Sequence, residues 1–484
     1  MRRGLLLSFL VLATEAAAGI QTPSEGSADA AALKKSCDKG VVADCLALAD
    51  RHAKGEGAPR DAKQAASLYK KACDKGSGLG CLELGQRHRS GEGVPKDVPK
   101  AVQLLERACL TGEAEACSTV GLMSLSGAEV AKDLARAADF LDKGCQTGSA
   151  RACTALGTMH EAGLRFAKDP KAAAEQYQKS CAAGHAEGCA RLGVLLRDGQ
   201  GVTRDVAKAV AYFRRGCEAG LPGSCYDLGL AHERGEGAAK DAAQARALFQ
   251  QACDSADAGA CHRLGLMTRD GVGAGKDVAA SAALFKKACD GGSAPACYEL
   301  AVAHDNGRGV PKNLAEAMLH YQKACSGSDA RACHDLGILF SGGRGVARDA
   351  RRAADYFRLS CEADDPRACS KVAALYEAGE GIAPNWEKAR TAYQRSCEAG
   401  MGVDCFNAAR LVLRGDGNRA GQPGDAAPWY ARACERGYAS ACYELAVLHE
   451  KGLGVARNPE RAFALYKQAC TGGDTRGCPK SRER

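Results

Sequence analysis

Hydrophobic, small and polar residues recur along the chain in a fixed order that predicts pairs of amphipathic helices. In one unit, Leu84, Gly85 and His88 lie three, four and seven residues after a cysteine, a spacing that forms one face of a helix. Segment 91–94 contains two glycines, which adopt conformations that end helices. Asp97 follows as an N-cap for a second helix. The unit is therefore predicted to be helix–loop–helix.

The second helix has a recurrent pattern of its own. The position four residues before the next cysteine is aromatic in ten of twelve units, as at Tyr69, Phe213, Phe249, Tyr321 and Tyr466. N-cap residues recur at Asp61, Asp133, Asp169, Asp205, Asp241, Asp277, Asn313, Asp349, Asn385 and Asn458. Neither helix can bury its apolar face alone, so the units are expected to stack. The predicted fold class is all-α, an α/α solenoid of twelve 36-residue helix–loop–helix repeats.

Cysteine sets the length of the unit. The 26 cysteines form pairs eight residues apart, and successive pairs are 36 residues apart except for one step of 37. The pairs are Cys37 and Cys45, Cys73 and Cys81, Cys109 and Cys117, Cys145 and Cys153, Cys181 and Cys189, Cys217 and Cys225, Cys253 and Cys261, Cys289 and Cys297, Cys325 and Cys333, Cys361 and Cys369, Cys397 and Cys405, Cys434 and Cys442, and Cys470 and Cys478. A fixed period of this length indicates a repeat array rather than separate globular domains. The array is predicted to span 37–478, after an N-terminal segment and capping helix at 19–36 and before a tail at 479–484.

Each cysteine pair spans the turn between the second helix of one unit and the first helix of the next. Such a turn can bring the two Cα atoms within the ~4.4–6.8 Å that a disulfide needs. Metal binding is the alternative, but zinc sites use four ligands, usually as two close pairs, and here each pair stands alone. We therefore predict thirteen disulfides, one at each junction, and no metal site.

The first 18 residues have the pattern of a cleaved signal peptide. Arg2 and Arg3 form a basic start, segment 5–13 is apolar, and alanines at 16–18 form a small-residue cleavage site. The apolar run has about half of the ~20 residues that a membrane-spanning helix needs, and no second such run follows. The protein is expected to be exported, either to a periplasm or out of the cell, where disulfides form.

Composition excludes one class of partner. The chain has 66 Lys and Arg residues against 58 Asp and Glu residues, a net charge of +8 that is spread over 484 residues with both signs mixed throughout. Nucleic-acid binding needs a concentrated basic surface, so nucleic acid is not an expected partner.

The repeat unit resembles a known family. The motif L-G-x-x-[HY]-x-x-G-x-G-V-x-x-D-x-x-K-A, present at 84–101 and with variations at 192–209, is similar to the Sel1-like repeat, a relative of the tetratricopeptide repeat. With a cysteine pair in every unit, the chain resembles the cysteine-rich Sel1 proteins first known from Helicobacter. The resemblance covers nearly the whole chain after the signal peptide. It implies a solenoid and an adaptor role, and the Helicobacter branch adds a penicillin-binding or β-lactamase-like activity as the alternative.

Residues for β-lactam hydrolysis do not form a complete set. Ser36 and Ser67 match S-x-x-K, together with Lys39 and Lys70, but the S-D-N and K-T-G elements of serine β-lactamases are absent from the sequence. The zinc class would need clustered histidines, and H-x-H is absent as well. We expect no catalytic residue and no cofactor; any enzyme activity would be a weak β-lactam hydrolysis.

Histidine recurs seven residues after the opening cysteine of six units, at His52, His88, His160, His232, His304 and His449. A metal or haem ladder is one interpretation. However, equivalent positions in adjacent units lie on the order of 10 Å apart or more, which is too far for one ion. The favoured interpretation is an aromatic-sized packing residue that also forms a hydrogen bond with the loop.

The residue directly after the opening cysteine becomes a ring in the later units, at Tyr226, His262, Tyr298, His334, Phe406 and Tyr443. The following residue is polar in each case. First helices line the inner surface of tetratricopeptide-like arrays, so these rings are predicted to bind a protein or peptide in a groove between 225 and 470. The alternative is that the rings only pack between first helices.

The sequence thus favours an exported scaffold that binds proteins, peptides or cell-wall components through its concave surface, with a monomer expected. A β-lactamase-like hydrolase is the alternative.

One unit departs from the pattern: the loop at 415–425 is four residues longer than usual, and the following helix is expected to be three residues shorter, with Pro428 in its first turn. Drift in loop length is the favoured interpretation.

Overall fold

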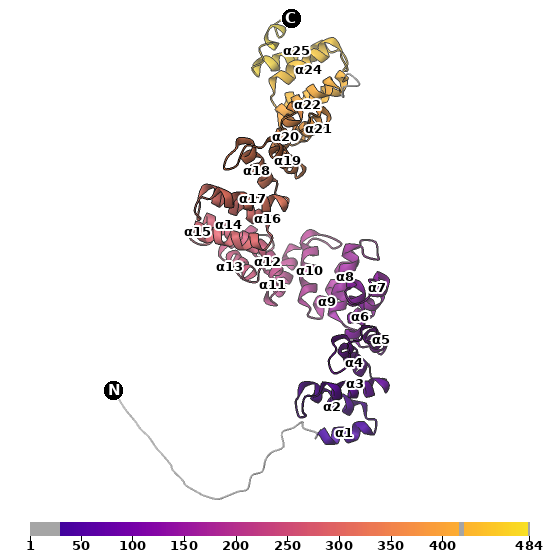
Figure 1. Ribbon diagram of the computed structural model, residues 1–484. Coiled ribbons are helices and arrows are strands. Elements are labelled where there is room, and N and C mark those ends of the chain that lie inside the picture. Colours follow the sequence, from indigo (N-terminus) through magenta and orange to yellow (C-terminus); the bar gives the residue numbers. More distant parts are fainter. Residues whose placement is uncertain (1–29, 416–420, 483–484) are drawn as a thin grey trace, which may run out of the picture. The chain divides into compact units, whose positions relative to one another are not determined.

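The computed structural model describes residues 30–415 and 421–482, and every regular element in these ranges is a helix (Figure 1). The predicted signal peptide at 1–18 and the rest of the N-terminal segment before Ala30 lie outside the described residues. The chain divides into two compact units, with the division after Arg204. We call them unit 1 and unit 2. No helix in the described ranges is both long enough and apolar enough to span a membrane.

Unit 1 contains ten helices in its described part. They are α1 (Ala30–Asp38), α2 (Val42–Lys54), α3 (Ala62–Asp74), α4 (Gly78–Ser90), α5 (Val98–Leu110), α6 (Ala114–Ser126), α7 (Leu134–Gln146), α8 (Ala150–Ala162), α9 (Pro170–Ala182) and α10 (Ala186–Asp198). The helices α2, α4, α6, α8 and α10 are first helices of their repeats, and α3, α5, α7 and α9 are second helices.

Unit 2 continues the same alternation in its described part. Its helices are α11 (Val206–Glu218), α12 (Pro222–Arg234), α13 (Ala242–Asp254), α14 (Ala258–Asp270), α15 (Val278–Asp290), α16 (Ala294–Asn306), α17 (Leu314–Ser326), α18 (Ala330–Gly342), α19 (Ala350–Glu362), α20 (Pro366–Ala378), α21 (Trp386–Glu398), α22 (Gly402–Arg414), α23 (Pro423–Glu435), α24 (Ala439–Lys451), α25 (Pro459–Thr471) and α26 (Gly477–Lys480). The prediction of an all-α solenoid of helix pairs is confirmed.

Local sequence explains where each helix begins and ends. The predicted N-caps accept hydrogen bonds from the first turn of the second helix, as Asp61 does from the backbone N–H groups of Lys63 and Gln64. First helices end at a glycine in the left-handed conformation, such as Gly91, where φ is 85°. These two devices fix the lengths of both helices, so nearly all of them have 13 residues.

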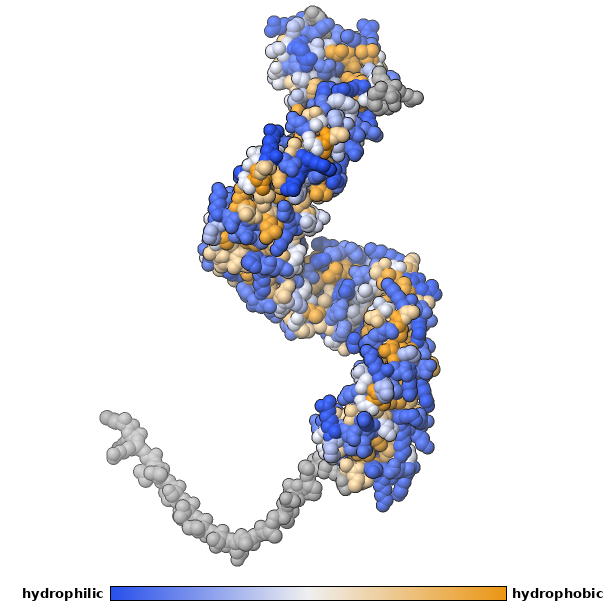
Figure 2. Space-filling view, in the orientation of Figure 1, coloured by the Kyte–Doolittle hydropathy of each residue, from blue (hydrophilic) through white to orange (hydrophobic). Residues whose placement is uncertain are grey.

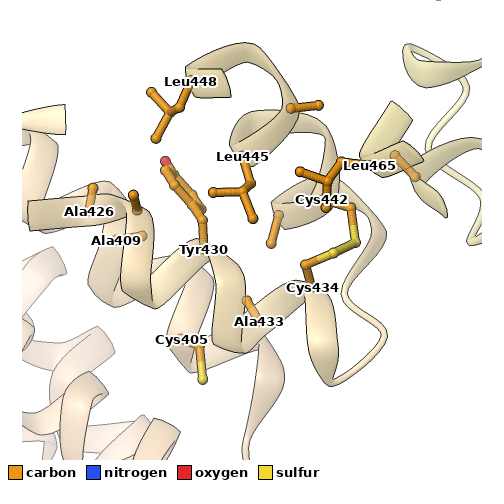
Figure 3. Close-up of a cluster of buried hydrophobic side chains, with 14 of the residues drawn as sticks. Cys405, Ala409, Ala426, Tyr430, Ala433, Cys434, Cys442, Leu445, Leu448 and Leu465 are labelled. Carbon is orange, nitrogen blue, oxygen red and sulfur yellow. A yellow bond between two sulfur atoms is a disulfide. The ribbon is translucent and has the colours of Figure 1, made fainter. Parts of the chain in front are cut away.

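Within a repeat, a small residue on the first helix lets the second helix approach closely. A Cβ atom added to Gly229 would lie 2.7 Å from Cε1 of Phe249, and one added to Gly265 would lie 2.6 Å from Cε1 of Phe285. The aromatic residue four positions before the closing cysteine is therefore buried against first-helix backbone. Figure 3 shows the corresponding pair near the C-terminus, Ala409 of α22 and Tyr430 of α23. Leu445 and Leu448 of the next first helix and the Cys434–Cys442 disulfide belong to the same cluster.

The thirteen predicted disulfides are all present, and each joins the end of one helix to the start of the next. Their Cα–Cα distances are 4.5–4.8 Å. No cysteine is left unpaired in the described part of the chain. The covalent links therefore lie at the junctions, where the chain turns from one helix into the next.

The prediction for the irregular repeat was wrong. Helix α23 begins at Pro423 and has the usual 13 residues, so it is not three residues shorter, and Pro428 lies inside it rather than in its first turn. Proline fits the first position of a helix because its fixed φ is helical and its missing N–H is not needed there. Asp425 lies in the first turn, and Gln422 takes the cap position without a side-chain hydrogen bond.

Candidate interaction surface on the first helices

Six rings lie at one register position on first helices of unit 2. We call Tyr226, His262, Tyr298, His334, Phe406 and Tyr443 the ring ladder. All six side chains are partly exposed. They come from α12, α14, α16, α18, α22 and α24, so each ring belongs to a different repeat.

Each ring of the ladder contacts the buried ring of its own second helix. The centroid distances are 5.7 Å for Tyr226 and Phe249, 6.0 Å for His262 and Phe285, 5.9 Å for Tyr298 and Tyr321, 5.8 Å for His334 and Phe357, 5.6 Å for Phe406 and Tyr430, and 5.5 Å for Tyr443 and Tyr466. Tilted and edge contacts of this kind stabilise aromatic pairs. One edge of each ring thus packs on the core, while each side chain keeps some exposed surface.

Arginine covers two of the rings from the next repeat. The guanidinium of Arg331 lies 4.1 Å from the centroid of Tyr298, and that of Arg476 lies 4.2 Å from the centroid of Tyr443. The hydroxyl of Tyr298 also donates a hydrogen bond to Asp335, at 3.2 Å. Burial raises the pKa of Tyr298 to about 12. Through these contacts, Tyr298 and Tyr443 each pack against residues of the following repeat.

Tyr226 has a different neighbour. Gly259 takes the place in the next repeat that Arg331 takes beside Tyr298, two residues before the opening cysteine, and a Cβ atom there would lie 3.5 Å from Tyr226. Because glycine has no side chain, nothing longer than a backbone atom covers the ring from this position. Tyr226 is therefore less covered from this position than Tyr298 is.

A row of aliphatic residues lies one helical turn beyond the ladder, which the sequence reasoning missed. Leu230, Leu266, Val302 and Ile338 each follow a ladder residue by four positions, so they share its helix face. The first three are partly exposed, and Ile338 is 43% exposed. The signal was present in the sequence, since an aliphatic residue recurs five positions after the opening cysteine of these four repeats. Ring and aliphatic residue together form an apolar strip on each of α12, α14, α16 and α18.

Charged residues beside this strip pair with each other across repeats. Arg263 lies 3.8 Å from Glu233 of the preceding first helix, and Arg269 lies 2.7 Å from Glu299 of the following one. Glu299 also lies 3.5 Å from Arg331. These pairs neutralise much of the charge on the face. The face of the molecule seen in Figure 2 has hydrophobic patches among hydrophilic residues.

His262 is the most perturbed member of the ladder. Burial, together with the nearby Arg263, Arg331 and Arg269, lowers its pKa to about 4. Its buried Nε2 atom has no hydrogen-bond partner in the described part of the chain. The imidazole is therefore neutral at pH 7 and acts there as an aromatic ring.

The histidines seven residues after the opening cysteine mostly act as predicted. The Nδ1 atoms of His52, His88, His232 and His449 lie 3.0–3.3 Å from a carbonyl oxygen of the following loop. His160 instead stacks on Phe166 at 4.3 Å, and His304 stacks on His320 at 5.6 Å. No cluster of metal ligands exists among the described residues. The prediction that these histidines pack and fasten the loop is confirmed for four of six.

The two serines that match S-x-x-K occupy structural positions. The hydroxyl of Ser36 donates a hydrogen bond to Asp44 across the first junction. Ser67 is exposed on α3, and Lys70 forms an ion pair with Asp74 at 3.1 Å. Neither serine has a base and an oxyanion site beside it in the described contacts.

Comparison with known proteins agrees with the repeat pattern. The family model described as Sel1 repeat matches twelve consecutive segments, 43–77, 78–112, 114–149, 150–185, 186–221, 222–257, 258–293, 294–329, 330–365, 366–401, 405–438 and 439–474. The chain is similar in fold to the crystal structure of c5321, a protective antigen of uropathogenic Escherichia coli strains, with 24% identity, a TM-score of 0.65, and coverage of 94% of this chain and 90% of that one. A Sel1 repeat protein from Oxalobacter formigenes shows 21% identity and a TM-score of 0.51, over 64% of this chain and 89% of that one.

A third solved structure is similar to a smaller part of the chain. The Helicobacter pylori cysteine rich protein B is 31% identical over 27% of this chain and 93% of its own length, with a TM-score of 0.23.

Proposed function

The chain belongs to the Sel1 repeat family, whose repeats form protein-interaction scaffolds, and on that premise we propose that it is an exported scaffold that binds a protein or peptide along the ring ladder of unit 2. The observation that carries the proposal is the strip on α12, α14, α16 and α18, where each partly exposed ring is followed four residues later by a partly exposed or exposed aliphatic residue. Large rings lose little conformational entropy on binding and bury much area, so they serve well as anchors.

The disulfides support a preorganised surface. On the chain-entropy model, closing a loop of this size contributes about 2.5 kcal/mol per bridge. A scaffold that is already ordered has less conformational freedom to lose when a ligand binds. Thirteen local bridges therefore favour binding by a rigid face rather than by induced folding.

The same bridges support export. Stable disulfides form in oxidising compartments and are rare in a reducing cytosol. The proposed signal peptide at 1–18 would direct the chain to a periplasm or out of the cell. In that location the partner is an envelope or extracellular protein, a peptide or a cell-wall component, bound by a monomer.

The spacing of the anchors constrains the ligand. Packed helices lie about 8–10 Å apart, so anchors on successive first helices are separated by at least that distance. A ligand that contacts several of them must be elongated. Because the adjacent charges already pair with each other, its contact residues are expected to be apolar or aromatic.

Affinity capture from the native cell envelope tests this proposal. Full-length bait is compared with Tyr226→Ala/Leu230→Ala, which removes the anchors of α12. The matched control is Leu319→Ala, because Leu319 is 47% exposed and lies on the second helix α17, which carries no ladder residue. The proposal expects capture to fall in the first variant and to persist in the control, with both variants folded by circular dichroism. Equal capture by all three proteins would refute it.

A further inference from the structure

A polar cleft lies in unit 1, apart from the ring ladder. It has a volume of about 840 Å³ and is lined by residues of α4 and α6, by the loops that follow them, and by Arg151 at the start of α8. Small-molecule sites typically have volumes of roughly 300–1,000 Å³. The cleft therefore has the size of a ligand site, and its lining carries charges of both signs.

Arg87 is a buried charge at this cleft. It is 7% exposed, and its Nε and Nη1 atoms have no hydrogen-bond acceptor in the described part of the chain. The carboxylate of Glu92 lies 3.5 Å from Nη1, and the ring of Tyr69 lies 5.0 Å from the guanidinium carbon. A buried guanidinium with unmet donors is costly.

The fold itself does not require a charge at this position. Arg87 lies six residues after the opening cysteine, where the next three repeats of unit 1 have Met123, Met159 and Leu195, all buried. An apolar side chain therefore suffices for packing. The cost of a buried arginine suggests a role beyond packing.

Two carboxylates in the cleft also lack ion pairs. Glu83 and Glu115 form no salt bridge within the described residues, and Glu115 accepts only a long side-chain hydrogen bond of 3.5 Å from Gln86. Burial raises the pKa of Glu83, and the nearby carboxylates of Asp50 and Glu115 raise it further, against the opposing effect of Arg87. A cation placed between Glu83 and Glu115 would offset the repulsion between the two carboxylates.

The remaining charges separate into paired and unpaired groups. Arg89 and Glu129 neutralise each other, with two nitrogens of Arg89 within 2.8 Å of the carboxylate. Arg151 has no ion-pair partner among the residues that the structure describes. The cleft thus offers Arg87, which has unmet donors and one ion-pair contact of 3.5 Å with Glu92, and three groups without an ion pair, Arg151, Glu83 and Glu115.

We propose that this cleft binds a small zwitterionic ligand, a short peptide with a free ammonium and a free carboxylate group. The ammonium pairs with Glu83 and Glu115, and the carboxylate lies toward Arg151 over the positive charge of Arg87. Leu122 and Met123 supply the apolar part of the lining. A ligand of one sign would leave one of the two unmatched groups uncompensated.

Calorimetry on the full chain tests the proposal with trialanine as the probe, in three forms: with both ends free, with the amino end acetylated, and with the carboxyl end amidated. The free form is expected to bind at least tenfold more tightly than either capped form. Glu115→Gln should weaken the free form at least tenfold without changing binding of the acetylated form. Arg151→Gln should weaken the free form similarly without changing binding of the amidated form.

Two further variants keep the result interpretable. Glu175→Gln is the matched control, because Glu175 is exposed on α9 outside the cleft, and it should leave all affinities unchanged. Arg87→Met introduces the residue that the next two repeats carry, so the melting temperature should be unchanged or raised while the preference for a free carboxylate falls at least tenfold. Equal affinity for free and capped trialanine, no binding at all, or a lowered melting temperature with unchanged affinity in Arg87→Met would overturn the proposal. None of these outcomes depends on the ring ladder.

Discussion

The hydroxyl of Tyr177 on α9 donates a hydrogen bond of 2.6 Å to the carboxylate of Glu161 on α8. The same pair recurs near the C-terminus, where Tyr466 donates to Glu450 at 2.6 Å. In each case the tyrosine is the buried aromatic residue of the second helix, and the glutamate lies eight residues after the opening cysteine of the first. Where the second helix carries phenylalanine, as at Phe285, this link is absent. Tyrosine therefore adds a directional bond to a contact that is otherwise only packing.

Tyr177→Phe should lower the free energy of unfolding by about 1–2 kcal/mol, because it removes a hydrogen bond to a charged group without opening a cavity. Tyr321→Phe is the matched control, since Tyr321 is equally buried but its hydroxyl makes no hydrogen bond among the described residues. Urea denaturation measures both. Equal losses in the two variants would show that the hydroxyl bond of Tyr177 contributes nothing.

Ala256→Gly should stabilise the protein. Ala256 has a φ of 65°, and most junctions have glycine at this turn position, as at Gly220, where φ is 83°. An L-residue in this left-handed conformation costs about 1–2 kcal/mol, so relief of that strain should raise the melting temperature. Gly220→Ala should lower it by a comparable amount. Ala219→Gly, one residue earlier with a φ of −81°, is the control and should not stabilise.

His262→Phe should reduce the loss of stability in mild acid. Burial lowers the pKa of His262 to about 4, below the ordinary value of 6.5, so the folded state resists a proton that the unfolded state accepts. In the wild type, this contribution to stability is intact above pH 6.5 and is lost as the pH falls from 6.5 towards 4. Phenylalanine occupies the same register at Phe406 and does not titrate. Melting temperatures at pH 7 and pH 5 measure the difference; an equal drop in both proteins would contradict the argument.

Local rules allowed most of the fold to be predicted from sequence. The caps, the glycine stops and the disulfides each depend on residues within about one repeat, so their positions could be derived from spacing alone. The start of α23 could not be derived in this way, because Asp425 matched the usual cap type while Pro423 provided an equally good first residue. Two local signals competed there, and the analogy with the other repeats favoured the wrong one.

The candidate site depended on contacts that spacing does not reveal. The ring ladder was visible as a repeated position, but Arg331 covers Tyr298 from the next repeat, whereas Gly259 leaves Tyr226 open. The two tyrosines differ in exposure to this contact because of a single side chain, arginine or glycine, that lies more than 30 residues from the tyrosine in sequence. The buried Arg87 is similar: its unmet donors become visible only when the atoms around it are known.

Removal of one disulfide should destabilise the protein without unfolding the array. Cys253→Ala/Cys261→Ala opens one junction, and the chain-entropy model gives a loss of about 2.5 kcal/mol. Thiol titration of denatured, unreduced wild type should give essentially no thiol, while Cys253→Ala alone should give one. A substantial thiol count in the wild type would contradict the pairing.

The two ladder tyrosines should differ in what they contribute. Tyr298 packs on Tyr321, lies under Arg331 and donates a hydrogen bond to Asp335, so Tyr298→Ala removes core packing, a cation–π contact and a hydrogen bond together. Truncation of a fully buried aromatic residue costs about 3–5 kcal/mol, and a partly exposed ring with these contacts should cost about half of that. Tyr226→Ala removes a similar ring contact with Phe249 but has no arginine above it in the described contacts, so its cost should be smaller.

The loss of partner binding should follow the opposite order and be larger for Tyr226→Ala than for Tyr298→Ala. A partner can cover the ring of Tyr226 because no arginine of the protein lies over it in the described contacts. Melting temperature and envelope capture, measured on both single variants, test this relation. Tyr226→Ala is expected to lose more capture and less thermal stability than Tyr298→Ala. If Tyr226→Ala instead causes the larger drop in melting temperature and leaves capture intact, Tyr226 is a packing residue and the anchor lies elsewhere on the chain.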